Sequence, residues 1–171
     1  SAFSIDAGLK YFILGAFSSS LFLLGSSLIY CSSGTLCFSD LQDLFMDMYL
    51  NPYESHFVRF ELTRYGLVLI LISLFFKLAI APFHSWAPNV YENSPTSSTF
   101  FFSVVPKLSI FVLLLRLANV SYEFVISNMK HYIYFIIILT VIVGSFGGLE
   151  QRKLKSLLVY SSISHMGYSL I

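Results

Sequence analysis

Charged residues are scarce in this sequence. Only 11% of the 171 residues are Asp, Glu, Lys or Arg, whereas a soluble domain carries about 25%. Hydrophobic residues make up 56%, so water is not the main solvent of the folded chain. The nine acidic and ten basic residues nearly cancel, and no basic run or basic and aromatic stripe occurs. The composition predicts an integral membrane protein that contacts lipids, and it gives no support to nucleic-acid binding.

Cysteine is also rare, and the motifs of several enzyme classes are missing. Only Cys31 and Cys37 occur, at a spacing unlike the paired-cysteine metal motifs. We interpret them as small apolar residues, although a disulfide between them stays open. The sequence contains no phosphate-binding loop, nucleophilic triad or cluster of metal ligands. It therefore predicts neither a metal site nor a redox centre in this chain.

Long apolar segments are what the sequence has instead. A helix needs about 20 apolar residues to cross the hydrocarbon core of a bilayer, and five segments reach or approach that length. We therefore expect an all-α, polytopic transmembrane bundle, with residues 1–171 forming one partial membrane domain. The expected spans are residues 11–30, 65–91, 99–117, 132–149 and 156–171.

A polar loop is expected between the first two spans, at residues 31–64. It holds five acidic residues, and the pattern from Asp40 to Tyr49 indicates a short amphipathic helix. We interpret the loop as a solvated connector without chemistry. Basic residues are balanced between the two sides of the membrane, so they set no overall orientation. The basic cluster at residues 152–155 favours the inner side for that turn.

Small and polar residues mark the last two spans. Gly144 and Gly148 stand four apart on one helical face and would let a neighbouring helix approach closely. His165 lies among the serines at positions 161, 162 and 164, which form a polar stripe. This stripe could hold water, or it could make hydrogen bonds between packed helices.

Lys77 lies deep inside the second span. The run from Leu67 to Phe76 precedes it with Ser73 as the only polar residue, and another apolar run follows. Placing a lysine at the centre of a span costs about 2.5 to 3.5 kcal/mol, so such residues usually face a partner or an aqueous path. Each end of the span is about 18 Å away at helical rise, too far for the side chain to reach the interface.

Pro82 predicts a break in the same span. It has no amide hydrogen and so frees the carbonyl of Leu78 from its helical bond. Non-helical backbone at membrane depth is tolerated where protein or water satisfies it, and an ionisable residue beside a break is typical of an ion or proton site. The sequence therefore predicts a broken helix near Lys77 to Pro82, although a purely structural kink stays open.

The third span repeats this arrangement. Pro106 comes directly before Lys107 and frees the carbonyl of Phe102, while Ser103 lies one turn back on the face of the lysine. Desolvation penalises a charged ammonium, so two buried lysines could load and release protons near physiological pH. We predict that Lys77 and Lys107 transfer protons.

His84 and Lys10 are further candidates for a relay. His84 falls seven residues after Lys77, nearly on the same helical stripe if the break does not rotate it, but a histidine hydrogen-bonded at the break fits equally well. Lys10 lies with Asp6 at the mouth of the first span and is equally ambiguous.

Three ordered segments resemble a known family. The stretch from Phe75 to Phe111, FFKLAIAPFHSWAPNVYENSPTSSTFFFSVVPKLSIF, is similar to the signature of the antiporter-like subunits of respiratory complex I, in particular the subunit 2 group. The flanks DAGLKYFILGAFSSSLFLLG (Asp6 to Gly25) and LKSLLVYSSISHMGY (Leu154 to Tyr168) resemble flanking segments of the same group, in the same order. Together they cover nearly the whole chain.

The resemblance implies a proton-translocating subunit of NADH:ubiquinone oxidoreductase in the mitochondrial inner membrane. Lys77 would be the central proton-exchanging residue, Lys107 its partner, and Lys10 a link toward an acidic residue of an earlier helix. FMN, iron–sulfur clusters and ubiquinone would be bound by other subunits, and the partners would be the other membrane-arm subunits. A cation/proton antiporter subunit and a structural segment that does not pump are the alternatives.

The family pattern also extends beyond this chain. Its glutamate-bearing helix would lie before Ser1 and its second broken helix after Ile171, so we expect a separate chain or a missing segment to complete the subunit. The acidic insert from Asp40 to Glu61 departs from the pattern.

Overall fold

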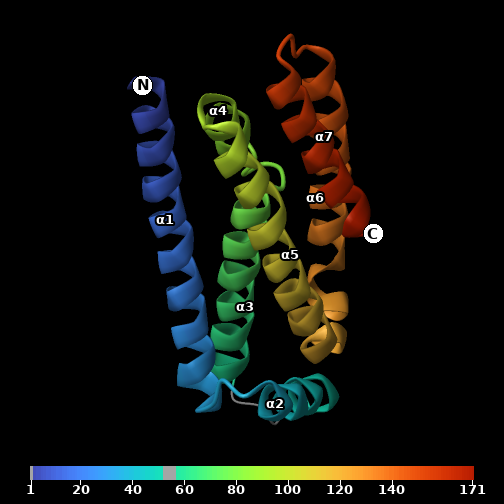
Figure 1. Cartoon of the computed structure of the whole chain (residues 1–171). Coiled ribbons are helices and arrows are strands. Elements are labelled where there is room, and N and C mark those ends of the chain that lie inside the picture. Colours follow the sequence, from blue (N-terminus) through green and yellow to red (C-terminus); the bar gives the residue numbers. More distant parts are fainter. Residues whose placement is uncertain (1, 52–56) are drawn as a thin grey trace.

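Helices form the whole regular structure of the described residues. The computed structural model describes residues 2–51 and 57–171, in which no strand occurs. The all-α prediction is confirmed (Figure 1). The helices are α1 (Ala2–Ser33), α2 (Phe38–Leu50), α3 (Phe57–Leu78), α4 (Trp86–Asn93), α5 (Thr96–Val120), α6 (Tyr122–Leu149) and α7 (Leu154–Ser169).

The segment that we expected as one span, 65–91, consists of two helices. α3 ends at Leu78 because Ala79 takes a left-handed conformation, with φ of 58°. The amides of Ala79 and Ile80 then donate to the carbonyls of Phe76 and Phe75 at 3.1 and 3.0 Å, which closes the helix in a Schellman pattern. The predicted break between Lys77 and Pro82 is confirmed, and it falls at Ala79, before the proline.

Small residues bring α1 and α3 together. A side chain added at Gly25 would lie 2.7 Å from the carbonyl oxygen of Gly66, so the two backbones touch. The buried hydroxyl of Ser73 donates to the carbonyl of Ser18 at 2.7 Å, and the Ser32 and Thr63 hydroxyls are also 2.7 Å apart. Close packing and cross-helix hydrogen bonds therefore fix the rotation of α1 against α3.

α6 and α7 form a second close pair. A side chain at Gly144 would lie 2.6 Å from the backbone of Ser164, as expected for a packing glycine. Gly147 is the second tight position, at 2.4 Å from the Tyr160 ring, whereas Gly148 meets Tyr160 only at an ordinary 3.7 Å. The predicted close approach is right for Gly144, but Gly147 takes the place that we assigned to Gly148.

α2 lies across one end of the bundle (Figure 1). Its buried residues, Leu41, Phe45 and Met48, share one face of the helix, and the first two pack into a cluster with Ile29 and Leu67. Asp40 lies in its first turn, where a carboxylate suits the helix dipole. The segment 31–64 therefore contains an amphipathic helix, while its last residues from Phe57 onward belong to α3.

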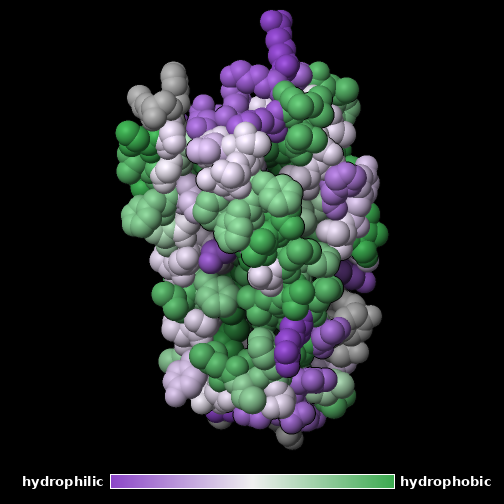
Figure 2. Space-filling view, in the orientation of Figure 1, coloured by the Kyte–Doolittle hydropathy of each residue, from purple (hydrophilic) through white to green (hydrophobic). Residues whose placement is uncertain are grey.

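The outer surface of the bundle is apolar. Phe12, Phe100 and Phe135 are 72%, 73% and 65% exposed, far more apolar surface than a soluble protein tolerates. Figure 2 shows this hydrophobic surface over the middle of the molecule and hydrophilic residues at its two ends. Within the described ranges, three segments are long and apolar enough to cross a membrane: Ser4–Ser33, Thr96–Val120 and Met129–Leu149. α3 and α7 lie alongside them, and the count of five spans stays a prediction.

Candidate functional site

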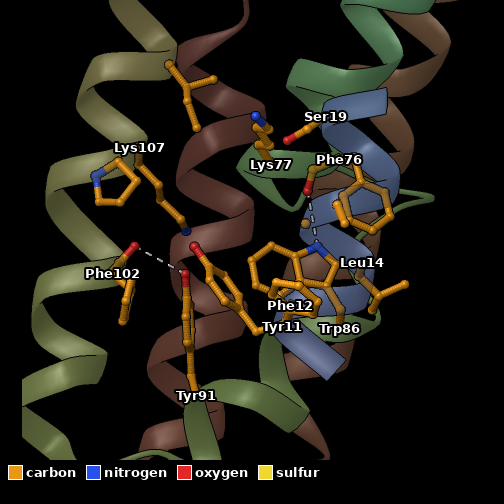
Figure 3. A pocket seen from close by; sticks show the side chains of 14 residues that line it. Tyr11, Phe12, Leu14, Ser19, Phe76, Lys77, Trp86, Tyr91, Phe102 and Lys107 are labelled. Carbon is orange, nitrogen blue, oxygen red and sulfur yellow. Dashed lines mark hydrogen bonds between the residues drawn. The ribbon is translucent and has the colours of Figure 1, made fainter. Parts of the chain in front are cut away.

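Lys77 and Lys107 line the same cavity. The cavity has a volume of about 450 Å³ and is bounded by side chains of α1, α3, α4 and α5 (Figure 3). Its other polar side chains are Tyr11, Ser19, Trp86 and Tyr91, and no carboxylate is among the residues that line it. Two cations that are 30 positions apart in sequence therefore share one largely apolar chamber.

Lys107 is the buried member of the pair. It is 3% exposed, and its ammonium donates to the Ser162 hydroxyl of α7 at 3.1 Å. Ser162 donates in turn to the carbonyl of Val159 at 2.8 Å. A single neutral hydroxyl replaces little of the solvation that the ammonium loses on burial. Ser162 belongs to the polar stripe expected in this helix, whereas His165 is exposed.

Lys77 is less constrained. It lies in the last turn of α3, where the carbonyl end of the helix favours a cation. Its side chain is half-buried and points toward Ser19 of α1 (Figure 3). It forms no hydrogen bond or ion pair with another residue in the described part of the chain. Lys107 is therefore held by α7, whereas Lys77 has no such partner among the described residues.

Two side chains of α4 donate hydrogen bonds to backbone carbonyls, one beside the break in α3 and one near Pro106 in α5. The Trp86 indole donates to the carbonyl of Phe76 at 3.1 Å, beside the break in α3. The Tyr91 hydroxyl donates at 3.3 Å to the carbonyl of Phe102, which Pro106 was expected to free. Both donors also line the cavity. The carbonyl of Phe76 also accepts from the amide of Ala79, so Trp86 adds a second donor there, whereas Tyr91 satisfies a Phe102 carbonyl that would otherwise be costly at membrane depth.

The four polar residues of the cavity other than the lysines were not singled out from the sequence: Tyr11, Ser19, Trp86 and Tyr91. Tyrosine and phenylalanine are abundant here, with 11 and 18 residues, so aromatic residues in an apolar segment indicated only a lipid-facing surface. The site is also built by ring packing across helices, with Tyr11 and Phe102 centroids 5.2 Å apart. No local spacing signals a contact between residues 91 positions apart.

The other two predicted relay residues lie outside this cavity. Lys10 is bound to Asp6 at 2.6 Å, and both side chains are more than half exposed. The ring of His84 lies 6.5 Å from Tyr160 of α7, and its Nδ1 atom is buried without a hydrogen-bond partner among the described residues. Because α3 stops at Leu78, the helical stripe from Lys77 does not continue to His84. Their roles as relay residues stay predictions.

A polar cluster joins α4 to the start of α7. Lys153 forms an ion pair with Glu92, and the Ser156 hydroxyl donates to the same carboxylate at 2.7 Å. Lys155 donates to the carbonyl of Ser94 at 2.9 Å. The hydrogen bonds from Lys153 and Ser156 lower the pKa of the Glu92 carboxyl below its ordinary value. The cluster holds the helix that carries Tyr91 against the helix that carries Ser162.

Comparison with known families gives one match over the whole chain. Residues 1–171 match the family described as NADH:quinone oxidoreductase/Mrp antiporter, TM. The chain is 44% identical over 99% of its length to NADH-quinone oxidoreductase subunit N of Wolbachia sp. subsp. Brugia malayi, covering 35% of that protein. It is 42% identical over 100% of its length to NADH-ubiquinone oxidoreductase chain 2 of Marchantia polymorpha, covering 34% of it. The chain thus spans about a third of the length of these relatives.

Solved structures give the same picture of the fold. Respiratory complex I from Thermus thermophilus contains a chain that matches 99% of this one with a TM-score of 0.78 and 34% identity, over 34% of its own length. The Mrp complex from Dietzia sp. contains a chain that matches 99% with a TM-score of 0.84 and 21% identity, over 29% of its own length. The second likeness, at this identity, shows the fold alone.

Proposed function

Because this chain belongs to the NADH:quinone oxidoreductase/Mrp antiporter transmembrane family, we propose that it carries out proton transfer within a membrane-arm subunit of complex I. The observation that carries the proposal is the shared cavity, which Lys77 of α3 and Lys107 of α5 both line. A lysine side chain can accept and release a proton, and both lysines line one largely apolar cavity.

The two lysines have different parts in this proposal. Lys77, at the break, receives a proton, and a change in a neighbouring charge drives that proton to Lys107. Moving one charge against 100 mV requires about 2.3 kcal/mol, which modest electrostatic coupling between buried groups can supply. Lys107 then passes the proton toward α7, where Ser162 already accepts its hydrogen bond.

Electron transfer belongs elsewhere in this proposal. NADH oxidation and ubiquinone reduction, with FMN and the iron–sulfur clusters, take place on other subunits, so this chain is part of an enzyme without redox chemistry of its own. Its partners are the neighbouring membrane-arm subunits, lipids, and the remaining two thirds of a subunit as long as its relatives.

The mitochondrial inner membrane is the proposed location. The relative from Marchantia polymorpha, a plant, is named as an NADH-ubiquinone oxidoreductase chain and is 42% identical, which supports this location. The relative from Wolbachia is 44% identical, so a bacterial membrane is the competing location. Mapping the gene to an organellar or a bacterial genome, followed by membrane fractionation, distinguishes the two.

A cation/proton antiporter subunit is the alternative function. The fold is also that of a chain in the Mrp complex, with a TM-score of 0.84. The higher identities, 44% and 42%, belong to NADH oxidoreductase subunits and favour the first proposal. Sodium-dependent transport that does not need NADH would favour the antiporter.

Lysine substitutions in the assembled complex test the proposed function. Lys77→Met and Lys107→Met keep much of the side-chain volume and remove the protonatable group. We expect each to abolish proton translocation coupled to NADH oxidation while the complex still assembles. Lys130→Met, at an exposed position of α6, is the matched control and should be neutral. Normal proton translocation in both cavity variants would show instead that this segment is structural.

A further inference from the structure

Tyr11 brings a hydroxyl from α1 into the lysine cavity. The neighbouring Lys10, which is turned about 100° away around the helix, points outward to Asp6 and does not line the cavity. In Figure 3 the Tyr11 hydroxyl points toward the ammonium of Lys107, close to the Tyr91 hydroxyl. α1 therefore brings two hydroxyls to the cavity, that of Ser19 beside Lys77 and that of Tyr11 toward Lys107.

The two tyrosines of the cavity differ in their hydrogen-bonding capacity. A phenol has one hydrogen to donate, and Tyr91 donates its hydrogen to the carbonyl of Phe102. Toward the cavity, Tyr91 can only accept. The Tyr11 hydroxyl forms no hydrogen bond with another residue of the described chain, so it can accept one hydrogen and donate another. Passing a proton along a chain requires both abilities in the same group.

Ring contacts hold Tyr11 in place without using its hydroxyl. Its ring centroid lies 5.9 Å from that of Trp86 and 5.2 Å from that of Phe102. Offset and tilted ring pairs of this kind stabilise by dispersion and quadrupole contacts. A phenylalanine at position 11 would keep these contacts and lose only the oxygen.

We propose that Tyr11 relays the proton between Lys77 and Lys107, with Tyr91 as a fixed acceptor that orients the Lys107 ammonium. This inference rests on the proposed function. In one transfer the Tyr11 hydroxyl donates its hydrogen toward Lys107, which becomes an ammonium, and takes a hydrogen from a bridging water, which is resupplied by the Lys77 ammonium as that group becomes an amine. Tyr11 is a neutral phenol before and after the transfer. The cavity of about 450 Å³ also has room for waters of about 30 Å³ each to bridge the remaining gaps.

The test uses the full subunit in its assembled complex, reconstituted into proteoliposomes. Tyr11→Phe should lose proton translocation to the level of Lys107→Met, although the amount of assembled complex is unchanged. The matched control is Tyr30→Phe, the same substitution at an exposed position at the far end of α1, which should leave translocation unchanged. Tyr11→His should recover a large part of the lost rate, because an imidazole also accepts and donates hydrogen.

The outcomes separate this inference from the proposed function. If Lys107→Met abolishes translocation but Tyr11→Phe keeps the rate of the unaltered complex, the inference is wrong and the proposed function stands. If both Tyr11→Phe and Tyr11→His lose translocation in a fully assembled complex, Tyr11 acts through packing and the inference is equally wrong. Normal translocation in Lys107→Met would overturn the proposed function itself.

Discussion

Two helices of this chain carry a lysine close to a proline, and they respond differently. α3 ends at Leu78, whereas α5 runs from Thr96 to Val120 with Pro106 inside it. In α3, the left-handed Ala79 turns the backbone out of the helix, and two amide bonds close the last turn. In α5, the helix continues through Pro106, and the Tyr91 hydroxyl donates to the carbonyl of Phe102.

The difference shows that a proline alone does not decide between a break and a continuous helix. A proline removes one amide hydrogen, and a single well-placed side chain can replace that donor. A break also needs a residue that changes the direction of the backbone, which here is Ala79. Side chains of α4 donate hydrogen bonds to a backbone carbonyl at both places. Trp86 donates to Phe76 beside the break in α3, and Tyr91 donates to Phe102 near Pro106 in α5.

The largest expected effect comes from enlarging Ala79. Ala79→Val places a β-branched residue at positive φ in a fully buried site, so we expect a loss of about 3 kcal/mol in the free energy of unfolding. Thermal denaturation in detergent and the yield of assembled complex would measure it. Ala118→Val, at an exposed position in α5, is the control and should change stability by less than about 1 kcal/mol. Equal stability of the two variants would contradict a left-handed Ala79.

A double-mutant cycle tests how α5 tolerates Pro106. Tyr91→Phe leaves the carbonyl of Phe102 without its side-chain donor, and we expect a loss of about 1 to 3 kcal/mol. Pro106→Ala restores an amide hydrogen that can bond the same carbonyl. In that background Tyr91→Phe should cost about 1 kcal/mol less, as measured by thermal denaturation.

The control cycle pairs Tyr91→Phe with Val112→Ala, at an exposed position one turn and a half further along α5. These two changes should add to within about 0.5 kcal/mol. Additivity in both cycles would mean that Tyr91 does not replace the missing donor of Pro106.

The smallest expected effect on stability concerns the cluster of Glu92, Lys153 and Ser156, which joins α4 to α7. Since Lys153 and Ser156 lower the pKa of the Glu92 carboxyl, the ionised form stabilises the folded state. This stabilisation is present above about pH 4.3, the ordinary value for glutamate, and is lost as the pH falls through the lowered value. For a partly exposed pair we expect less than about 1 kcal/mol.

Glu92→Gln should therefore remove this part of the acid dependence and slightly lower the stability at pH 7. Thermal denaturation in detergent between pH 7 and 3.5 would show it. Glu150→Gln, at an exposed carboxylate that forms no ion pair with a described residue, should leave the profile unchanged. A steeper profile for Glu92→Gln than for the unaltered chain would contradict the role of the cluster.

Features set by a few neighbouring residues were predictable. The apolar runs predicted a helical membrane protein, and Pro82 after Lys77 predicted a broken helix. The carbonyl of Phe102 was correctly expected to need a donor other than residue 106. The location of the break at Ala79 was not foreseen, because alanine, unlike glycine, carries no signal for positive φ.

The candidate site was predictable only in part, because some of its features depend on neighbouring residues and others on contacts between helices. The depth of Lys77 and Lys107 follows from the apolar residues around each of them. The rotation of α1 does not, since it depends on the contact of Gly25 with Gly66 and on hydrogen bonds such as that between Ser73 and Ser18. This rotation directs Tyr11 into the cavity and Lys10 away from it.

The sequence by itself therefore determined that the chain is a helical membrane protein with a lysine in each of two apolar segments, because transfer free energy and missing amide hydrogens act on single segments. Only the tertiary structure decided that Lys77 and Lys107 share one cavity, that Ser162 accepts a hydrogen bond from Lys107, and that the phenols of Tyr11 and Tyr91 line the same cavity. The contacts at this site join residues up to 91 positions apart, as between Tyr11 and Phe102. Packing between helices, which no local pattern encodes, sets their geometry.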